Sequence, residues 1–191
     1  MRYDPSKHHR RSVRLPAYDY SQPGAYFVTI VTDQRQCAFG AIVAGHMRLN
    51  EIGAVVREEW LRSAEIRGEI ALGEYVIMPS HVHGIVIIRD VGAHGHAPLP
   101  VRTRQRSARS LGSFVAGYKG AATKRINVIR GTPGHPVWQR NYYEHVIRSD
   151  EELNRIRQYI IDNPIHWDED PENPNAAGAV REPPLYEKSL T

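Results

Sequence analysis

The sequence predicts an α+β protein in which an antiparallel sheet of the split βαβ type carries helices on one or both faces. Stretches rich in β-branched and aromatic residues alternate with stretches of helical periodicity in the order β, α, β, β, α, β, α. The composition agrees, because 41% hydrophobic and 24% charged residues over 191 positions are typical of one soluble globular domain. The longest aliphatic run covers only residues 85–88, whereas a membrane helix needs roughly 20 apolar residues. With no apolar signal region at the start and a single cysteine, Cys37, we expect no membrane contact and a cytoplasmic location.

The first half of the chain is expected to supply most of the sheet. Residues 25–32 follow a Gln-Pro-Gly turn and are almost all β-branched or aromatic, which predicts a buried strand. Asn50 is a suitable N-cap for a helix in which apolar residues recur every three or four positions. A hairpin and two longer strands complete this half, and they are expected at 38–43, 46–49, 70–78 and 82–88.

The second half is expected to be more polar and less regular. Residues 90–107 are rich in Gly, Pro and Arg, which predicts a long loop. A basic helix over 107–129 and a strand over 137–147 are expected to follow. A capping box at 149–152 then opens a helix that ends at Asn163, before a proline.

Charge is distributed unevenly along the chain. Residues 91–143 contain nine Lys and Arg and no Asp or Glu, although the net charge of the whole chain is only +4. Such a block is typical of a surface that contacts phosphate, and it is equally compatible with a solvated loop and helix face. The candidate phosphate contacts are Arg102, Arg104, Arg106, Arg109, Lys119, Lys124 and Arg125, and in the N-terminal arm Arg10, Arg11 and Arg14.

Two His-x-His pairs could bind a metal ion, and only one of them is expected on a rigid element. His94 and His96 flank a glycine in the predicted loop, where nothing aims the rings, so we interpret them as surface residues. His81 and His83 lie at or near the start of the strand predicted over 82–88, so both imidazoles point to one side while Val82 points into the core. Two parallel imidazoles can hold a divalent cation and leave it open, as a catalytic site requires. Taken alone, the tripeptide is also compatible with two polar residues on a half-exposed strand face.

A second element supplies a candidate nucleophile. Tyr159 and Asn163 are spaced i and i+4 on the last predicted helix, so they share one flank and face the same point. A phenol is a poor nucleophile at neutral pH unless a cation or an electropositive pocket stabilises its anion, so a metal beside Tyr159 would make chemical sense. Taken alone, Tyr159 could be a boundary packing residue and Asn163 a helix C-cap. Tyr142 and Tyr143 have no ligand partner four residues later, and we assign them to packing or base stacking.

Three segments combine these features, and they are Met78-Pro79-Ser80-His81-Val82-His83, Trp138-Gln139-Arg140-Asn141-Tyr142-Tyr143-Glu144-His145-Val146-Ile147-Arg148 and Tyr159-Ile160-Ile161-Asp162-Asn163-Pro164. In this order they resemble the single-tyrosine HUH transposases of single-strand insertion sequences, and most of all the REP-associated tyrosine transposases. The likeness covers about residues 18–167. It implies a ferredoxin-like sheet and a catalytic transposase core at 21–167. Length and composition predict a single domain over 1–191, in which a basic arm at 1–20 precedes this core and an acidic, Pro-rich tail at 168–191 follows it.

The resemblance also implies roles for individual residues. His81 and His83 match the metal-binding HUH pair, Asn163 matches the third ligand of a Mg²⁺ or Mn²⁺ ion, and Tyr159 matches the nucleophile. The implied activity is that of a metal-dependent DNA transesterase, which cleaves and rejoins single-stranded or hairpin DNA through a 5′-phosphotyrosine intermediate. The basic residues named above would hold the DNA backbone, and we expect a monomer or a homodimer.

Two other functions remain open at the level of the sequence. A non-catalytic, sequence-specific DNA-binding module could retain this fold, and it would form no covalent adduct with DNA. A small His-metal enzyme of the cupin type would need a carboxylate soon after His83, and only Asp90, at the end of the strand, precedes Glu144. Glu144 and His145 match a recurrent pattern of the resembled family, but the sequence assigns them no physical role.

Overall fold

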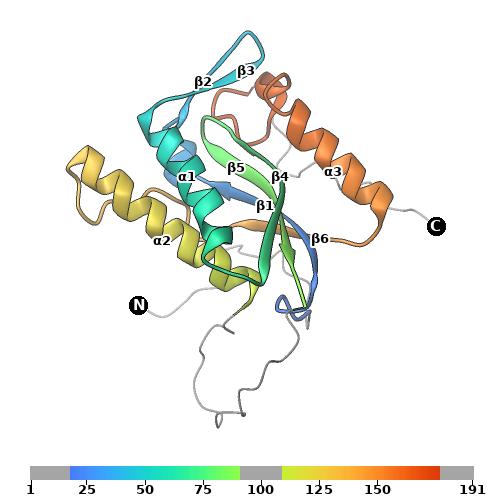
Figure 1. Cartoon of the computed structure of the whole chain (residues 1–191). Helices are drawn as coiled ribbons and strands as arrows, with labels where there is room; N and C mark the ends of the chain where they lie inside the picture. The colour runs from blue at the N-terminus through green and yellow to red at the C-terminus, as the bar shows by residue number, and fades with distance from the viewer. Residues whose placement is uncertain (1–17, 91–108, 177–191) are drawn as a thin grey trace, which may run out of the picture.

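The computed structural model describes residues 18–90 and 109–176 (Figure 1). Four strands form one sheet in the order β4-β5-β1-β6, and every neighbouring pair is antiparallel. These strands are β1 (Gly24–Val31), β4 (Ile70–Ile77), β5 (His81–Ile88) and β6 (Tyr143–Ile147). A separate hairpin consists of β2 (Gly40–Val43) and β3 (His46–Leu49). Because β5 lies between the two strands that the first helix connects, the predicted split βαβ, ferredoxin-like arrangement is confirmed.

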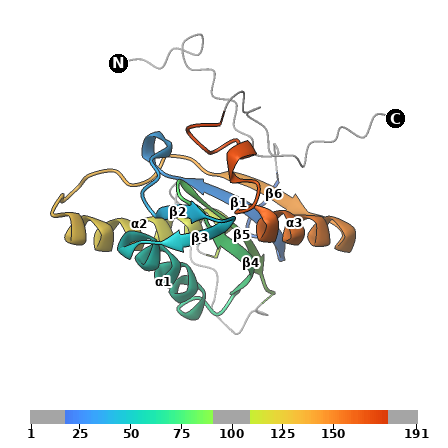
Figure 2. The same ribbon diagram turned by 90° about the horizontal axis from the view of Figure 1, so that it is seen from above.

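Three helices cover the sheet. α1 (Glu51–Glu65) and α2 (Leu111–Arg130) pack against each other on one face, and α3 (Asp150–Asp162) lies on the other (Figure 2). Two short 3-10 turns, η1 (Asp33–Arg35) and η2 (Trp167–Glu169), follow β1 and α3. In the two described ranges, no helix combines the length and the apolar character that crossing a membrane requires.

The side chains of the central strands alternate between two environments. On β5, Val82 and Val86 face the large apolar core beneath α1 and α2, whereas Ile85 faces α3. The histidines of β5 share the side of Ile85, which places them under α3. Only a small apolar cluster accompanies them there, and its buried members are Phe27, Ile85, Ile156 and Ile160.

The α1 helix approaches the sheet closely at Gly84. A Cβ atom at this position would lie 2.4 Å from Cζ2 of Trp60, so the indole ring packs directly on the strand backbone. Trp60 is fully buried and also contacts the rings of Phe114 and Tyr118 from α2. One aromatic residue therefore joins both helices to the sheet.

The strand that we expected over 137–147 is shorter in the structure. β6 begins only at Tyr143, and Trp138 makes no more than an isolated bridge with Thr32. The Lys119 ammonium group donates hydrogen bonds to the backbone carbonyls of Gln139 and Asn141, at 2.6 and 3.1 Å. These carbonyls therefore face α2, which explains why this part of the chain leaves the strand despite its alternating pattern.

The N-termini of α2 and α3 also differ from the prediction. α2 begins later than expected, because Ser110 and Ser113 form a capping box in which each hydroxyl accepts from the other backbone N–H at 3.2 Å. At α3, the Ser149 hydroxyl accepts from the Glu152 N–H at 3.2 Å. The Glu152 carboxylate accepts from the Arg148 N–H at 2.7 Å, one residue before the position that a capping box would use.

Candidate active site

His81 and His83 lie side by side at the start of β5, on the face covered by α3. Both are buried, and their ring centroids are 4.3 Å apart. The backbone that carries them pairs with β1 on one side, and at His83 also with β4 on the other. The strand period therefore aims both imidazoles to one side, and the sheet holds them rigidly.

The Nδ1 atom of each imidazole contacts a hydroxyl group. His83 Nδ1 lies 2.9 Å from Oγ1 of Thr29, and His81 Nδ1 lies 3.2 Å from Oγ of Ser80. The Ser80 hydroxyl donates to the Glu172 carbonyl at 2.8 Å, so its oxygen must accept the proton of His81 Nδ1. His81 Nε2 is then the lone-pair nitrogen; it is buried and makes no hydrogen bond to any residue in 18–90 or 109–176. Burial, followed by electrostatic repulsion from the neighbouring His83 side chain, holds the pKa of His81 well below its ordinary value, which maintains the neutral form that binds metals.

Asp170 completes this cluster from the segment after η2. Its Oδ2 atom lies 3.8 Å from Nε2 of His81 and 3.9 Å from Nε2 of His83, and all three residues are buried. Atoms at this spacing can share one divalent cation at ligand distances of roughly 2.0–2.2 Å. The group can therefore bind a metal ion. Asp170 lies in the stretch predicted to be an acidic tail, and no motif in the sequence marked it as a site residue.

Two donors hold the Asp170 carboxylate in place. The Glu172 N–H donates to Oδ1 at 2.7 Å, and the Asn163 side-chain amide donates to Oδ2 at 2.9 Å. Burial alone would raise the pKa of Asp170, but the neighbouring His83 and His81 side chains and the Glu172 N–H more than offset it and lower the pKa. The carboxylate is therefore ionised and faces the two imidazoles.

Tyr159 reaches the same point from α3. Its hydroxyl oxygen lies 3.3 Å from His83 Nε2, and its ring packs edge-on against Phe27. Asn163 directly follows α3 and is also buried at the cluster, so the i, i+4 pair meets the histidines as its spacing predicts. Burial and the charge of Asp170 raise the pKa of Tyr159, so these side chains favour the neutral phenol. A positive charge beside the hydroxyl would act in the opposite direction.

Two polar side-chain contacts join α3 to the two edge strands of the sheet. His145 on β6 contacts Glu152 at 2.6 Å, and Arg157 donates to Glu74 on β4 at 2.9 Å. The first contact gives His145 a physical role that the sequence did not indicate, since it fixes the start of the helix that carries Tyr159.

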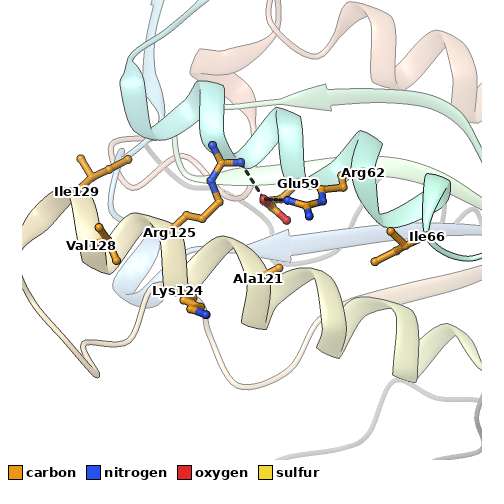
Figure 3. Close-up of a pocket in the computed structure, with 8 residues that line it drawn as sticks. All are labelled: Glu59, Arg62, Ile66, Ala121, Lys124, Arg125, Val128 and Ile129. Atoms are coloured by element: carbon orange, nitrogen blue, oxygen red, sulfur yellow. Dashed lines mark hydrogen bonds and ion pairs between the residues drawn. The ribbon is translucent and has the colours of Figure 1, made fainter.

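The candidate phosphate contacts on α2 lie on the opposite face of the sheet. Arg125 donates to Glu58 at 2.7 Å and to Glu59 at 2.8 Å, so its charge is balanced within the protein. Lys119 is held by the carbonyls described above. Lys124 is exposed and lines an open groove of about 560 Å³ between α1 and α2 (Figure 3). Arg109 is exposed just before α2.

The other candidate phosphate contacts belong to segments that the structure does not describe. They are Arg10, Arg11, Arg14, Arg102, Arg104 and Arg106, and the surface histidines His94 and His96 also lie outside the described residues.

Comparisons with known proteins place the chain among relatives. No protein-family model matches it. An uncharacterized protein of Haemophilus influenzae is 37% identical over 174 residues, which are 88% of this chain and 96% of the relative. A structure of a REP-associated tyrosine transposase bound to a REP hairpin has a TM-score of 0.56 at 16% identity, over 81% of this chain and 74% of that chain. A candidate transposase from Deinococcus radiodurans has a TM-score of 0.43 at 19% identity, over 79% and 97% of the two chains.

The strand order and the superposition show that the chain has the fold of this REP-associated tyrosine transposase, as the sequence resemblance predicted. Within that fold, the chain belongs to the same family as the Haemophilus influenzae protein, to which it is similar over nearly the whole length of that relative.

Proposed function

We propose that the protein is a metal-dependent DNA transesterase, which cleaves and rejoins single-stranded or hairpin DNA through a 5′-phosphotyrosine intermediate. The observation that carries this proposal is the meeting of two imidazoles, a carboxylate and a tyrosine hydroxyl in one cluster. The transposase fold and the REP hairpin held by the structural neighbour support DNA as the substrate.

The metal in this proposal is Mg²⁺ or Mn²⁺. His81 and His83 would bind it through Nε2, and Asn163 or Asp170 would supply an oxygen ligand, which suits a hard cation. A bound cation supplies the positive charge that polarises the scissile phosphate and stabilises a phenolate.

Tyr159 acts as the nucleophile. Its hydroxyl oxygen attacks the phosphorus in line with the 3′ oxygen and releases its proton to water, which the partly exposed side chain can contact. The bond between phosphorus and the 3′ oxygen breaks, and this oxygen takes up a proton to become a 3′-hydroxyl group. The new phosphotyrosine ester retains the energy of the broken bond, so a 3′-hydroxyl can reverse the reaction without a nucleotide cofactor.

In this proposal the DNA backbone binds mainly the basic residues of the N-terminal arm (1–20) and of the 91–109 segment, and fewer of those on α2. The buried apolar residues of α2 belong to the large core on one face of the sheet, whereas Tyr159 packs on the small cluster of the other face. A DNA strand at the nucleophile would therefore have to pass around the sheet to reach Lys124 on α2. Lys119 and Arg125 already bind groups of the protein itself.

The test is an incubation with labelled single-stranded and hairpin oligonucleotides from the genomic flanks, with Mg²⁺ or Mn²⁺, followed by a denaturing gel. The wild type should form a covalent protein–DNA adduct that EDTA prevents and that Tyr159→Phe abolishes. Tyr143→Phe is the matched control, because Tyr143 packs on the same Phe27 ring and should not affect the adduct. If the protein binds these strands and yields no adduct, the non-catalytic DNA-binding module becomes the better account.

A further inference from the structure

We propose that Asp170, and not Asn163, is the third protein ligand of the metal ion, and that Asn163 positions Asp170. The proposal rests on the proposed function for the presence of a divalent cation. It departs from the family resemblance, which assigns the third ligand to the position four residues after the tyrosine.

The position and charge of the donor atoms favour Asp170 as the ligand. Oδ2 of Asp170 is nearly equidistant from the two Nε2 atoms, at 3.8 and 3.9 Å, and the side chains of all three residues are almost completely buried. A divalent cation between two neutral imidazoles would carry its full charge in a buried place, which is costly without an anionic partner. The Asp170 carboxylate supplies that partner, whereas an amide oxygen cannot.

The orientation of the Asn163 side chain favours a positioning role for this residue. A carboxylate only accepts hydrogen bonds, so the contact at 2.9 Å fixes the amide nitrogen of Asn163 toward Oδ2 of Asp170. An amide that donates to a ligating carboxylate is the usual outer-sphere arrangement, which orients the ligand. The amide oxygen Oδ1 of Asn163 is buried without a hydrogen-bond partner among the described residues, and it is the competing donor that the experiment must separate.

Contacts of Glu172 hold the segment that carries Asp170 against the start of β5. Glu172 donates its N–H to Oδ1 of Asp170, its carbonyl accepts from Ser80, and its carboxylate accepts from Arg35 at 2.7 Å. Ser80 also accepts from His81 Nδ1, so one hydroxyl joins a histidine ligand to the segment that presents Asp170. This network gives Arg35 and Ser80 the role of positioning residues for the carboxylate.

The experiment measures Mn²⁺ affinity of the full chain by calorimetry without DNA, together with the absorption spectrum of bound Co²⁺. Asp170→Asn keeps the shape of the side chain and should weaken Mn²⁺ binding by about a hundredfold or more and change the Co²⁺ spectrum. Asn163→Ala should weaken binding by only about tenfold, as the loss of an outer-sphere partner does. Asp168→Asn is the matched control, an exposed carboxylate two residues away, and should leave the affinity unchanged.

Arg35→Ala provides a second measurement that removes no ligand. It breaks the contact with Glu172 and should weaken Mn²⁺ binding by about tenfold, because the segment is then less well fixed. Arg125→Ala is its control, since it breaks an ion pair of similar exposure on the other face of the sheet and should leave the affinity unchanged.

Wild-type Mn²⁺ affinity in Asp170→Asn would overturn the proposal, and so would a larger loss in Asn163→Ala than in Asp170→Asn. If Asp170→Asn does not fold, unchanged affinity in Arg35→Ala would overturn it. An Asp170-dependent metal site without any DNA adduct would support the ligand assignment and contradict the transesterase. A DNA adduct together with metal binding that does not depend on Asp170 would support the transesterase and contradict the ligand assignment.

Discussion

The two faces of the sheet differ in the side chains that they bury. Beneath α1 and α2 lies a large, continuous apolar core, in which Trp60 sits on the backbone of Gly84. Beneath α3 the buried apolar cluster has four members, and buried polar groups lie beside it. Alternate residues of β5 face the two sides of the sheet, so Val82 packs in the core while His81 and His83 on either side of it belong to the proposed site. One strand can therefore hold the proposed ligands rigidly, because its opposite side is firmly packed.

The difference also shows in how each helix is held. α1 and α2 bury many apolar side chains, whereas α3 buries Ile156 and Ile160 and adds the contacts of Glu152 and Arg157 with neighbouring strands. The polar groups of the site face lower its contribution to stability, since buried imidazoles and carboxylates are costly to desolvate. We expect substitutions on the core face to affect folding and substitutions on the site face to affect cleavage.

The largest effect should follow from His81→Ala or His83→Ala. Each should lower DNA cleavage by roughly a thousandfold or more, because the charge stabilisation that the metal supplies is worth several kcal/mol. Folding should be retained, since neither imidazole belongs to the apolar core. Cleavage assays in saturating Mn²⁺ and thermal melts of both variants decide the matter. Near-normal cleavage by either variant would count against a two-histidine site.

On the core face, Trp60→Ala should lower the free energy of unfolding by about 3–5 kcal/mol, because it leaves a large cavity between both helices and the sheet. Gly84→Ala should lower it by about 1–3 kcal/mol, because the new Cβ atom would displace the indole ring. Urea unfolding measures both. Leu61→Ala replaces a neighbour on α1 that is 43% exposed; it is the control and should change stability by less than about 1 kcal/mol. A Trp60→Ala protein as stable as this control would show that the two faces do not differ as described.

Much of this division follows from sequence periodicity. The two-residue period of the strand predicts that His81 and His83 share a side with Val82 opposite, and the helical period brings Tyr159 and Asn163 together. These local rules succeed because each pair lies on a single regular element. The antiparallel sheet was equally predictable, since its strands are long and apolar.

The remaining features depend on contacts between distant segments. Asp170 lies in an acidic, Pro-rich stretch that is typical of a solvated tail, and only the contacts of Glu172 with Ser80 and Arg35 bring it to the histidines. Likewise, Arg125 belongs to a block without acidic residues, yet its partner Glu59 comes from another helix. The count of charges along the chain therefore suggested more unpaired positive charge on α2 than the structure has, because Arg125 is paired with acidic residues of α1.

A smaller effect, on DNA affinity, should distinguish the arginines of the 91–109 segment from Arg125 on α2. Replacing Arg102, Arg104, Arg106 and Arg109 with Ala should weaken DNA binding and flatten the plot of log affinity against log salt, by roughly 0.7 for each phosphate that the protein no longer neutralises. Arg125→Ala should leave the slope unchanged, because this residue is paired within the protein on the face away from Tyr159. Equal slopes for the fourfold variant and the wild type would show that the 91–109 segment does not contact the backbone.

Identifying the tyrosine that becomes joined to DNA would test the proposed nucleophile directly. Wild type is incubated with a cleavable single strand and Mg²⁺, and the adduct is digested and mapped by peptide mass spectrometry. We expect the linked peptide to contain Tyr159, whose hydroxyl lies 3.3 Å from His83 Nε2. We also expect Tyr142→Phe and Tyr143→Phe to leave the adduct intact. A linked peptide containing Tyr142 or Tyr143 would contradict the assignment of the nucleophile and with it the proposed active site.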